Sequence, residues 1–173
     1  MKTLNQLSKS QFSALFTGLL VATIVLGSCS KDNNEVIIEG RAKIMIVNAA
    51  SCSQAQDFYL DNSKVNTEAV AYSQSSTYIS TDAGNSRKAE FKNNGNASVN
   101  FTGYVDLAAN QNYTFFYTGK ADGSGNSSAV FQDDKTTPSA NKAKIRFVNL
   151  AEGLSNANLL VIGGLTFASN VAF

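Results

Sequence analysis

Two carboxylates, Asp57 and Asp61, flank a short aromatic stretch and raise the question of acid–base catalysis. Carboxyl pairs that hydrolyse glycosides lie roughly 5–9.5 Å apart. On an extended strand, residues four positions apart share a face but are separated by roughly 13 Å. The two aspartates are therefore too far apart for this chemistry. The alternation instead predicts a polar outer face with Tyr59 and a buried face with Phe58 and Leu60.

A run of oxygen-bearing side chains has the spacing of a calcium-binding loop. Positions 1, 3, 5, 7 and 12 of that loop would be Asp122, Ser124, Asn126, Ser128 and Asp133. The sixth position is Ser127, where the sharp turn requires Gly, and the twelfth is Asp, where a bidentate Glu is usual. We therefore expect a glycine-rich hairpin loop here, with neither a metal ion nor any other cofactor.

Tyrosines are the remaining candidates for a binding surface, because sugar rings stack on exposed aromatic faces. The speculative ligand surface consists of Tyr72, Tyr78, Tyr104 and Tyr117. The chain has no Trp, which weakens a carbohydrate-binding interpretation. Phe115 and Phe116 are neighbours on an expected strand, so they point to opposite sides and at least one lies outside the core.

Composition narrows the chemistry further. The 173 residues include no His, which removes the usual general base and the Ser-His-Asp and Cys-His nucleophile systems. Fourteen Lys and Arg against thirteen Asp and Glu leave no basic excess to neutralise phosphates, so we expect no nucleic-acid partner. The sequence predicts a protein that is not an enzyme.

The N-terminal segment has a basic start and then an apolar run over residues 12–27, shorter than the ~20 residues that span a bilayer. The end of the run and the two residues after it read Leu26, Gly27, Ser28 and Cys29. These residues resemble the lipobox of bacterial lipoproteins. The resemblance implies that residues 1–28 are a signal peptide, that Leu26 to Ser28 are read by the signal peptidase, and that Cys29 carries the lipid, including palmitate-type acyl chains.

Residues 29–41 have the polar composition of a tether. Within it, Lys31, Asp32 and Glu35 resemble the signals that export lipoproteins of the Bacteroidota to the outer face of the outer membrane, although the two intervening asparagines depart from that pattern. We expect an outer membrane lipoprotein, held by its N-terminal lipid on the cell surface or the periplasmic face. Once Cys29 is acylated, Cys52 has no partner for an intramolecular disulfide.

An internal repeat organises the remainder of the chain. The stretch 42–48 recurs as 143–149, an offset of 101 residues, and the same offset relates Val70 to Val171. We therefore expect a first copy and then a shorter second copy.

The repeat gives three segments: a first copy over 42–134, a linker over 135–142 and an incomplete second copy over 143–173. The second copy holds about three strands, too few to bury a core alone. It is expected to be truncated, and either poorly packed or dependent on an edge of the first copy.

The first copy is rich in β-branched and aromatic residues at short intervals, with turn-forming residues between them. Candidate strands are 42–47, 57–60, 69–72, 77–80, 87–91, 97–101, 113–117 and 129–132. The dipeptide Asn94-Gly95 predicts a type I′ hairpin. The expected fold is all-β: an immunoglobulin-like antiparallel β-sandwich followed by a truncated second β-repeat.

Three motifs in order resemble the bacterial family known as domain of unknown function 4397. They are Ala-Lys-Ile-Met-Ile-Val-Asn-Ala-Ala at 42–50, Asp-Phe-Tyr-Leu-Asp at 57–61 and Ala-Val-Ala-Tyr-Ser-Gln-Ser-Ser-Thr-Tyr at 69–78. Cys52, Gln54 and Ser73 depart from the usual family residues. The resemblance implies an extracytoplasmic β-sandwich and no established activity, so no catalytic residue is carried over.

These observations favour a non-enzymatic, lipid-anchored envelope protein that acts by binding an unknown ligand or by surface architecture. The alternative is a glycan-binding accessory lipoprotein at the cell surface. Its partners would be the membrane, through the lipid, and an envelope protein or glycan. An exposed patch of at least two tyrosines beside Asn or Asp would favour the alternative.

Overall fold

The computed structural model describes residues 40–120 and 122–173, and within them it consists of strands and loops. The strands are β1 (Arg41–Asn48), β2 (Gln56–Leu60), β3 (Ser63–Lys64), β4 (Ile79–Asp82), β5 (Gly84–Asn93), β6 (Val99–Leu107), β7 (Asn112–Gly119), β8 (Asn126–Gln132), β9 (Asn156–Leu160) and β10 (Thr166–Ala172). In this part of the chain no helix is long and apolar enough to cross a membrane.

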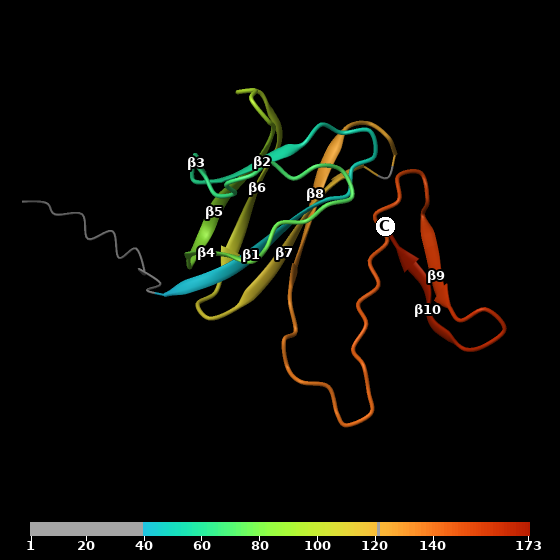
Figure 1. The fold of residues 1–173 in the computed structure, drawn as a ribbon. Helices are drawn as coiled ribbons and strands as arrows, with labels where there is room; N and C mark the ends of the chain where they lie inside the picture. Colours follow the sequence, from blue (N-terminus) through green and yellow to red (C-terminus); the bar gives the residue numbers. More distant parts are fainter. Residues whose placement is uncertain (1–39, 121) are drawn as a thin grey trace, which may run out of the picture. The chain divides into compact units, whose positions relative to one another are not determined.

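Strands β1–β8 form two four-stranded sheets that face each other (Figure 1), so the expected all-β fold is confirmed. One sheet has the order β4-β1-β7-β8 and the other the order β3-β2-β5-β6. The expectation of purely antiparallel pairing is wrong at one place, because β1 and β7 run parallel, with Lys43 opposite Asn112. Parallel neighbours need a long connection, and here residues 49–111 supply it. Within them β2, β3, β5 and β6 form the second sheet, while β4 returns to pair with β1.

Alternation along the strands produces the core between the sheets. In β1 the even positions Ala42, Ile44 and Ile46 are fully buried, whereas the odd positions lie at the surface or half-buried. Phe58 of β2 lies with its ring centroid 4.9 Å from the centroids of both Phe91 and Phe115, and so joins the two sheets. The other side of β7 carries Phe116, whose ring packs against Phe131 of β8 at 5.9 Å.

Residues 69–72 do not form the expected strand. Only Val70 forms a β-bridge there, with Gln56 at the start of β2. The reason is the buried side chain of Asn66, whose Oδ1 accepts a hydrogen bond from the Phe58 amide and whose Nδ2 donates to the Gln56 carbonyl. A side chain thus occupies backbone groups of β2 that a neighbouring strand would otherwise use.

The turn at Asn94-Gly95 is also different from the expected type I′. The Asn96 amide donates to the Asn93 carbonyl, which closes a four-residue turn. Of the two central residues only Gly95 has a positive φ, at 74°. Type I′ requires positive φ at both positions, so this pattern is that of a type II turn. Asn94 instead directs its amide group to the carboxylate of Asp57.

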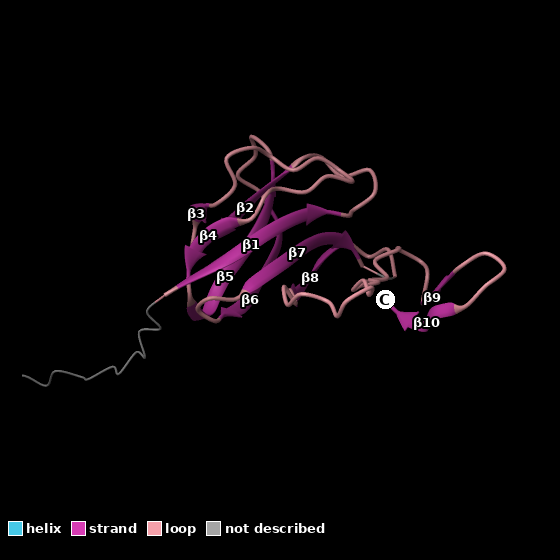
Figure 2. Ribbon diagram, turned by 60° about the horizontal axis from the view of Figure 1, so that its bottom comes forward, coloured by secondary structure: helices cyan, strands magenta, loops and turns pink. Residues whose placement is uncertain are grey.

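The C-terminal residues form a separate two-stranded sheet, β9–β10. Figure 2 shows this hairpin outside the two facing sheets. Residues 143–149 repeat the sequence of β1 but form no strand, and they run to the hairpin as an extended loop. Arg146 in this loop donates to the Gln132 carbonyl at the end of β8. The loop is therefore attached to the sandwich through side chains rather than through strand pairing.

Candidate functional site

The four tyrosines of the speculative ligand surface do not form one patch. Tyr117 is 2% exposed and packs against Phe91 in the core. Burial raises the pKa of its phenol. Tyr78 donates its hydroxyl to Asp133, and Tyr72 lies half-exposed in a loop. Tyr104 on β6 is the most exposed of the four, at 73%.

A different tyrosine accompanies Tyr104 on the outer face of the sheet β3-β2-β5-β6. The register places Tyr59 opposite Glu90, and Tyr104 opposite Lys88. The Nζ atom of Lys92 lies 4.2 Å from the centre of the Tyr59 ring, a cation–π contact. We call Tyr59, Tyr104, Lys88, Glu90 and Lys92 the outer polar face. The sequence placed Tyr59 on a polar face but gave no sign that Tyr104 would join it.

Glu90 organises the outer polar face, because its carboxylate is buried between two ammonium groups. Lys88 Nζ lies 2.6 Å from one carboxylate oxygen and Lys92 Nζ 3.6 Å from the other. The hydrogen bond from Lys88 lowers the pKa of Glu90 and outweighs burial, which alone would raise it. Glu90 is therefore ionised and fully paired, and cannot donate a proton at neutral pH.

Asp57 and Asp61 each hold a structural contact instead of forming a catalytic pair. Asp57 is buried and lies 2.7 Å from Lys64 Nζ. Asp61 forms an ion pair with Arg87 and accepts a hydrogen bond from the Lys88 amide. These contacts link β2 with its neighbours in the sheet.

The residues with calcium-loop spacing are not brought together. Asn126 and Ser128 belong to β8, which is extended up to Gln132. Asp133 therefore lies at the far end of that strand from Asp122, whose carboxylate accepts a hydrogen bond from the Ser124 amide. Within residues 40–120 and 122–173 there is no cluster of three His, Cys, Asp or Glu side chains able to hold a metal ion.

Asp133 instead connects three segments. One oxygen accepts hydrogen bonds from Thr114 of β7, at 2.7 Å, and from the hydroxyl of Tyr78, at 2.8 Å. The other pairs with the guanidinium of Arg146. Partial burial would raise the pKa of this carboxyl, but the three donors outweigh it and lower the pKa. The sequence gave no signal for this arrangement because its members are far apart in the chain.

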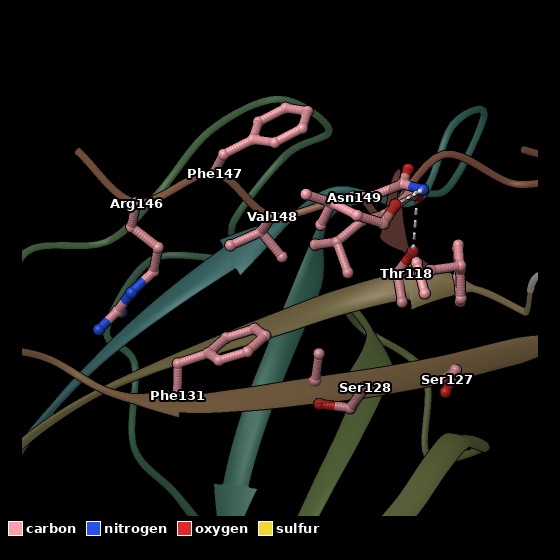
Figure 3. A pocket seen from close by; sticks show the side chains of 13 residues that line it. Thr118, Ser127, Ser128, Phe131, Arg146, Phe147, Val148 and Asn149 are labelled. Atoms are coloured by element: carbon pink, nitrogen blue, oxygen red, sulfur yellow. Dashed lines mark hydrogen bonds between the residues drawn. The ribbon is translucent and has the colours of Figure 1, made fainter. Parts of the chain in front are cut away.

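A cavity of about 480 Å³ lies between β8 and the C-terminal segment. Figure 3 shows Phe131 of β8 facing Val148 across it, while Phe147 points away from the strand. At one end, the hydroxyl of Thr118 donates to the Leu150 carbonyl. The buried Oγ of Ser128 also lines the cavity and has no hydrogen-bond partner within the described part of the chain. The walls are mainly apolar, and Arg146 is the only ionisable side chain among the lining residues.

The expected lipid attachment site lies outside the described residues. Leu26, Gly27, Ser28 and Cys29 all precede residue 40, as does most of the 29–41 tether. Cys52 is described, and it is an exposed free thiol in the turn after β1, with a positive φ of 59°. It lies at the surface and not in the core.

The sequence model of a protein family described as "Domain of unknown function (DUF4397)" matches residues 42–159. The match begins in β1, covers both sheets of the sandwich and ends in β9. No curated protein matches the chain.

Proposed function

This chain belongs to the DUF4397 family, and on that premise we propose that it is a non-enzymatic, lipid-anchored protein of the bacterial cell envelope. Its β-sandwich is a binding or structural module. One observation carries the non-enzymatic part of the proposal: the acidic groups on the sandwich with catalytic potential are held in structural contacts. Asp57 pairs with Lys64, Asp61 with Arg87, Glu90 with Lys88, and Asp133 with Arg146.

The lipid anchor is supported by the sequence Leu26-Gly27-Ser28-Cys29 after an apolar run. The test is metabolic labelling of producing cells with an alkyne palmitate, followed by detection of the full chain. The wild-type chain and the Cys52→Ser variant are expected to incorporate the label. The Cys29→Ala variant should incorporate none. Label that persists in Cys29→Ala would overturn the anchor.

Protease treatment of intact cells then determines the side of the membrane. We propose display at the cell surface, on the basis of Lys31, Asp32 and Glu35. The wild-type chain is expected to disappear from treated cells while a periplasmic marker stays intact. Full protection of the chain would place it on the periplasmic face and favour an architectural role in the envelope.

We also propose that residues 143–173 are a second, partial copy of the domain. In the first copy, Asn48 donates Nδ2 to the Val70 carbonyl at 3.1 Å. Asn149 donates Nδ2 to the Val171 carbonyl, also at 3.1 Å. Both residues of this contact are shifted by the same 101 positions that relate the two sequences. Further support comes from pairing, since Gln56 opposite Val70 corresponds to Ala157 opposite Val171.

The alternative function, glycan binding, is favoured by the outer polar face. Tyr59 and Tyr104 lie there beside the ammonium groups of Lys88 and Lys92, which can bond sugar hydroxyls. Tyr104→Ala should abolish retention on a glycan array if this face binds sugars, without changing stability, because the side chain is largely exposed. Tyr72→Ala, which alters an exposed tyrosine elsewhere, is the matched control. Equal retention of all three proteins would exclude this face as a sugar site.

A further inference from the structure

A polar pocket of about 400 Å³ lies at the end of the sandwich opposite the start of β1. Strand β1 begins at Arg41 and β7 runs parallel to it, so both strands end on this side (Figure 2). The pocket is lined by the loop after β1, the facing ends of β5 and β6, and the connection between β7 and β8. Loops held together at one end of a rigid scaffold are a common place for binding residues.

One wall of the pocket rests on a fixed network of buried amides. Gln56 is fully buried, donates Nε2 to Asn93 Oδ1 at 2.8 Å and accepts from Asn100 Nδ2 at 3.0 Å. Asn100 Nδ2 also donates to Asn93 Oδ1, at 2.6 Å. The Asn93 oxygen thus accepts twice, whereas its Nδ2 donates to no group within residues 40–120 and 122–173. Asn93 lines the pocket, so it offers a donor that is held in place and still available.

Glu152 is the only ionisable carboxylate among the residues that line the pocket. A Cβ atom on Gly119 would lie 2.7 Å from Glu152 Oε2, and a Cβ atom on Gly123 would lie 3.0 Å from Oε1. The carboxylate therefore occupies space that two glycines at the β7–β8 connection leave free. In the described part of the chain, Glu152 belongs to no ion pair. Its oxygens are available as strong acceptors for a donor in the pocket.

The groups on the walls select the chemistry of the ligand. No Lys or Arg lines the pocket, so an anionic ligand would find no counter-charge. A metal ion would find one carboxylate, and the described residues hold no group of three His, Cys, Asp or Glu side chains that could bind it. An amine would pair with Glu152 but leave the Asn93 donor without an acceptor. Sugar hydroxyls both donate and accept, so they match both groups, and the volume is that of a small-molecule site.

We propose that this pocket binds one residue of a neutral glycan. Glu152 accepts hydrogen bonds from sugar hydroxyls, and the amide group of Asn93 donates to another oxygen of the same sugar. The inference rests on the proposed role of the sandwich as a binding module, and it gives that module a site apart from the outer polar face. It also gives the second copy a function on the first, because at the 101-residue offset Glu152 corresponds to the uncharged Ser51.

Retention of the purified full chain on an array of neutral oligosaccharides tests the pocket. Glu152→Gln keeps the shape of the side chain but removes its charge. Because hydrogen bonds to a charged acceptor are roughly twice as strong as neutral ones, affinity should fall about tenfold or more. Glu68→Gln is the matched control, since it makes the same change at an exposed glutamate outside the pocket. It should leave affinity unchanged.

Cys52 provides a second measurement, because its exposed thiol also lines the pocket. The oligosaccharide that the array retains best should slow alkylation of Cys52 by iodoacetamide several-fold in the wild-type chain. The same concentration should give little protection in Glu152→Gln. Mass spectrometry of the peptide that contains Cys52 reads this thiol separately from Cys29, so the result is independent of lipidation.

Three results would overturn the proposal. Retention that is lost in Tyr104→Ala but kept in Glu152→Gln would move the sugar to the outer polar face and leave glycan binding itself intact. Protection of Cys52 by ethanolamine but by no oligosaccharide would make the pocket an amine site. A wild-type chain that binds no neutral oligosaccharide, or an equal loss in Glu152→Gln and Glu68→Gln, would leave the pocket without a sugar ligand. The labelling test of the lipid anchor is unaffected by each of these results.

Discussion

Arg146 forms an ion pair with Asp133, and this contact joins the C-terminal segment to the end of β8. Arg146 also donates to the Gln132 carbonyl, and its guanidinium lies 5.7 Å from the centre of the Phe131 ring. One side chain thus contacts three successive residues of the sandwich. Together with the hydrogen bond from Thr118 to the Leu150 carbonyl, it holds the loop before β9 against the sandwich.

Arg146→Ala should release the C-terminal segment while leaving the sandwich folded. The pair is partly exposed, so we expect a loss of about 1 kcal/mol in attachment. Hydrogen exchange should accelerate in residues 147–173 and stay unchanged in β1 and β7. Lys144→Ala removes a nearby and more exposed pair with Asp134 and should have no effect on exchange. Equal acceleration in both variants would contradict the assigned role of Arg146.

Asp133 should make the stability of the protein sensitive to acid. Its pKa is lowered in the folded state, so its contribution is complete above the unfolded-state pKa of about 3.9 and is lost as pH falls through the folded-state value. Urea unfolding should therefore show Asp133→Asn to be less stable than wild type at pH 7, with the difference shrinking below pH 4. A difference that stays constant down to pH 2 would contradict this assignment.

Phe58→Ala should destabilise the sandwich by about 3–5 kcal/mol, because it removes a fully buried ring that contacts Phe91 and Phe115. Leu159→Ala changes the equivalent position of the C-terminal hairpin, which is only partly buried. It should change the free energy of unfolding by about 1 kcal/mol or less. Chemical denaturation of both variants measures the contrast, and a large effect of Leu159→Ala would mean that the hairpin belongs to the main core.

Asn48→Ala should cost about 1–3 kcal/mol. The buried amide donates to the carbonyls of Gln54 and Val70 and accepts from the amide of Ala50. Its removal leaves the Ala50 amide without its partner, whereas the Gln54 and Val70 carbonyls keep hydrogen bonds from Gln56. Asn149→Ala should affect the hairpin alone, seen as faster exchange of its amides at an unchanged global unfolding midpoint. A shift of that midpoint comparable to Asn48→Ala would show that the two segments unfold together.

The sequence predicted the buried and exposed faces of strands in the first copy, but not the loop at 69–72 or the type of turn at Asn94-Gly95. The alternation in 42–47 correctly placed Ile44 and Ile46 in the core, because burial on one face of a strand leaves a period-two pattern. The opposite directions of Phe115 and Phe116 followed from the same geometry. The immunoglobulin-like arrangement remains a prediction.

Partners distant in sequence could not be predicted. Alternation shows that β1 has a buried face, but it does not indicate that β7 is its parallel neighbour. The same limit explains Tyr117, which lies in the core, and Tyr104, which lies at the surface. Both tyrosines lie in strand-like sequence, and only the location of the opposing sheet distinguishes them.

The parallel pairing of β1 with β7 also determines when the domain can fold. Strand β1 is the first of the described strands to be synthesised, yet its hydrogen-bonding partner at Asn112–Gly119 is among the last of the sandwich. Contacts between such distant segments carry a large loop-closure cost and slow the search for the native state. Strand β1 can therefore pair with β7 only after almost the whole domain has been synthesised. The sandwich can therefore be completed only after β7 has been synthesised.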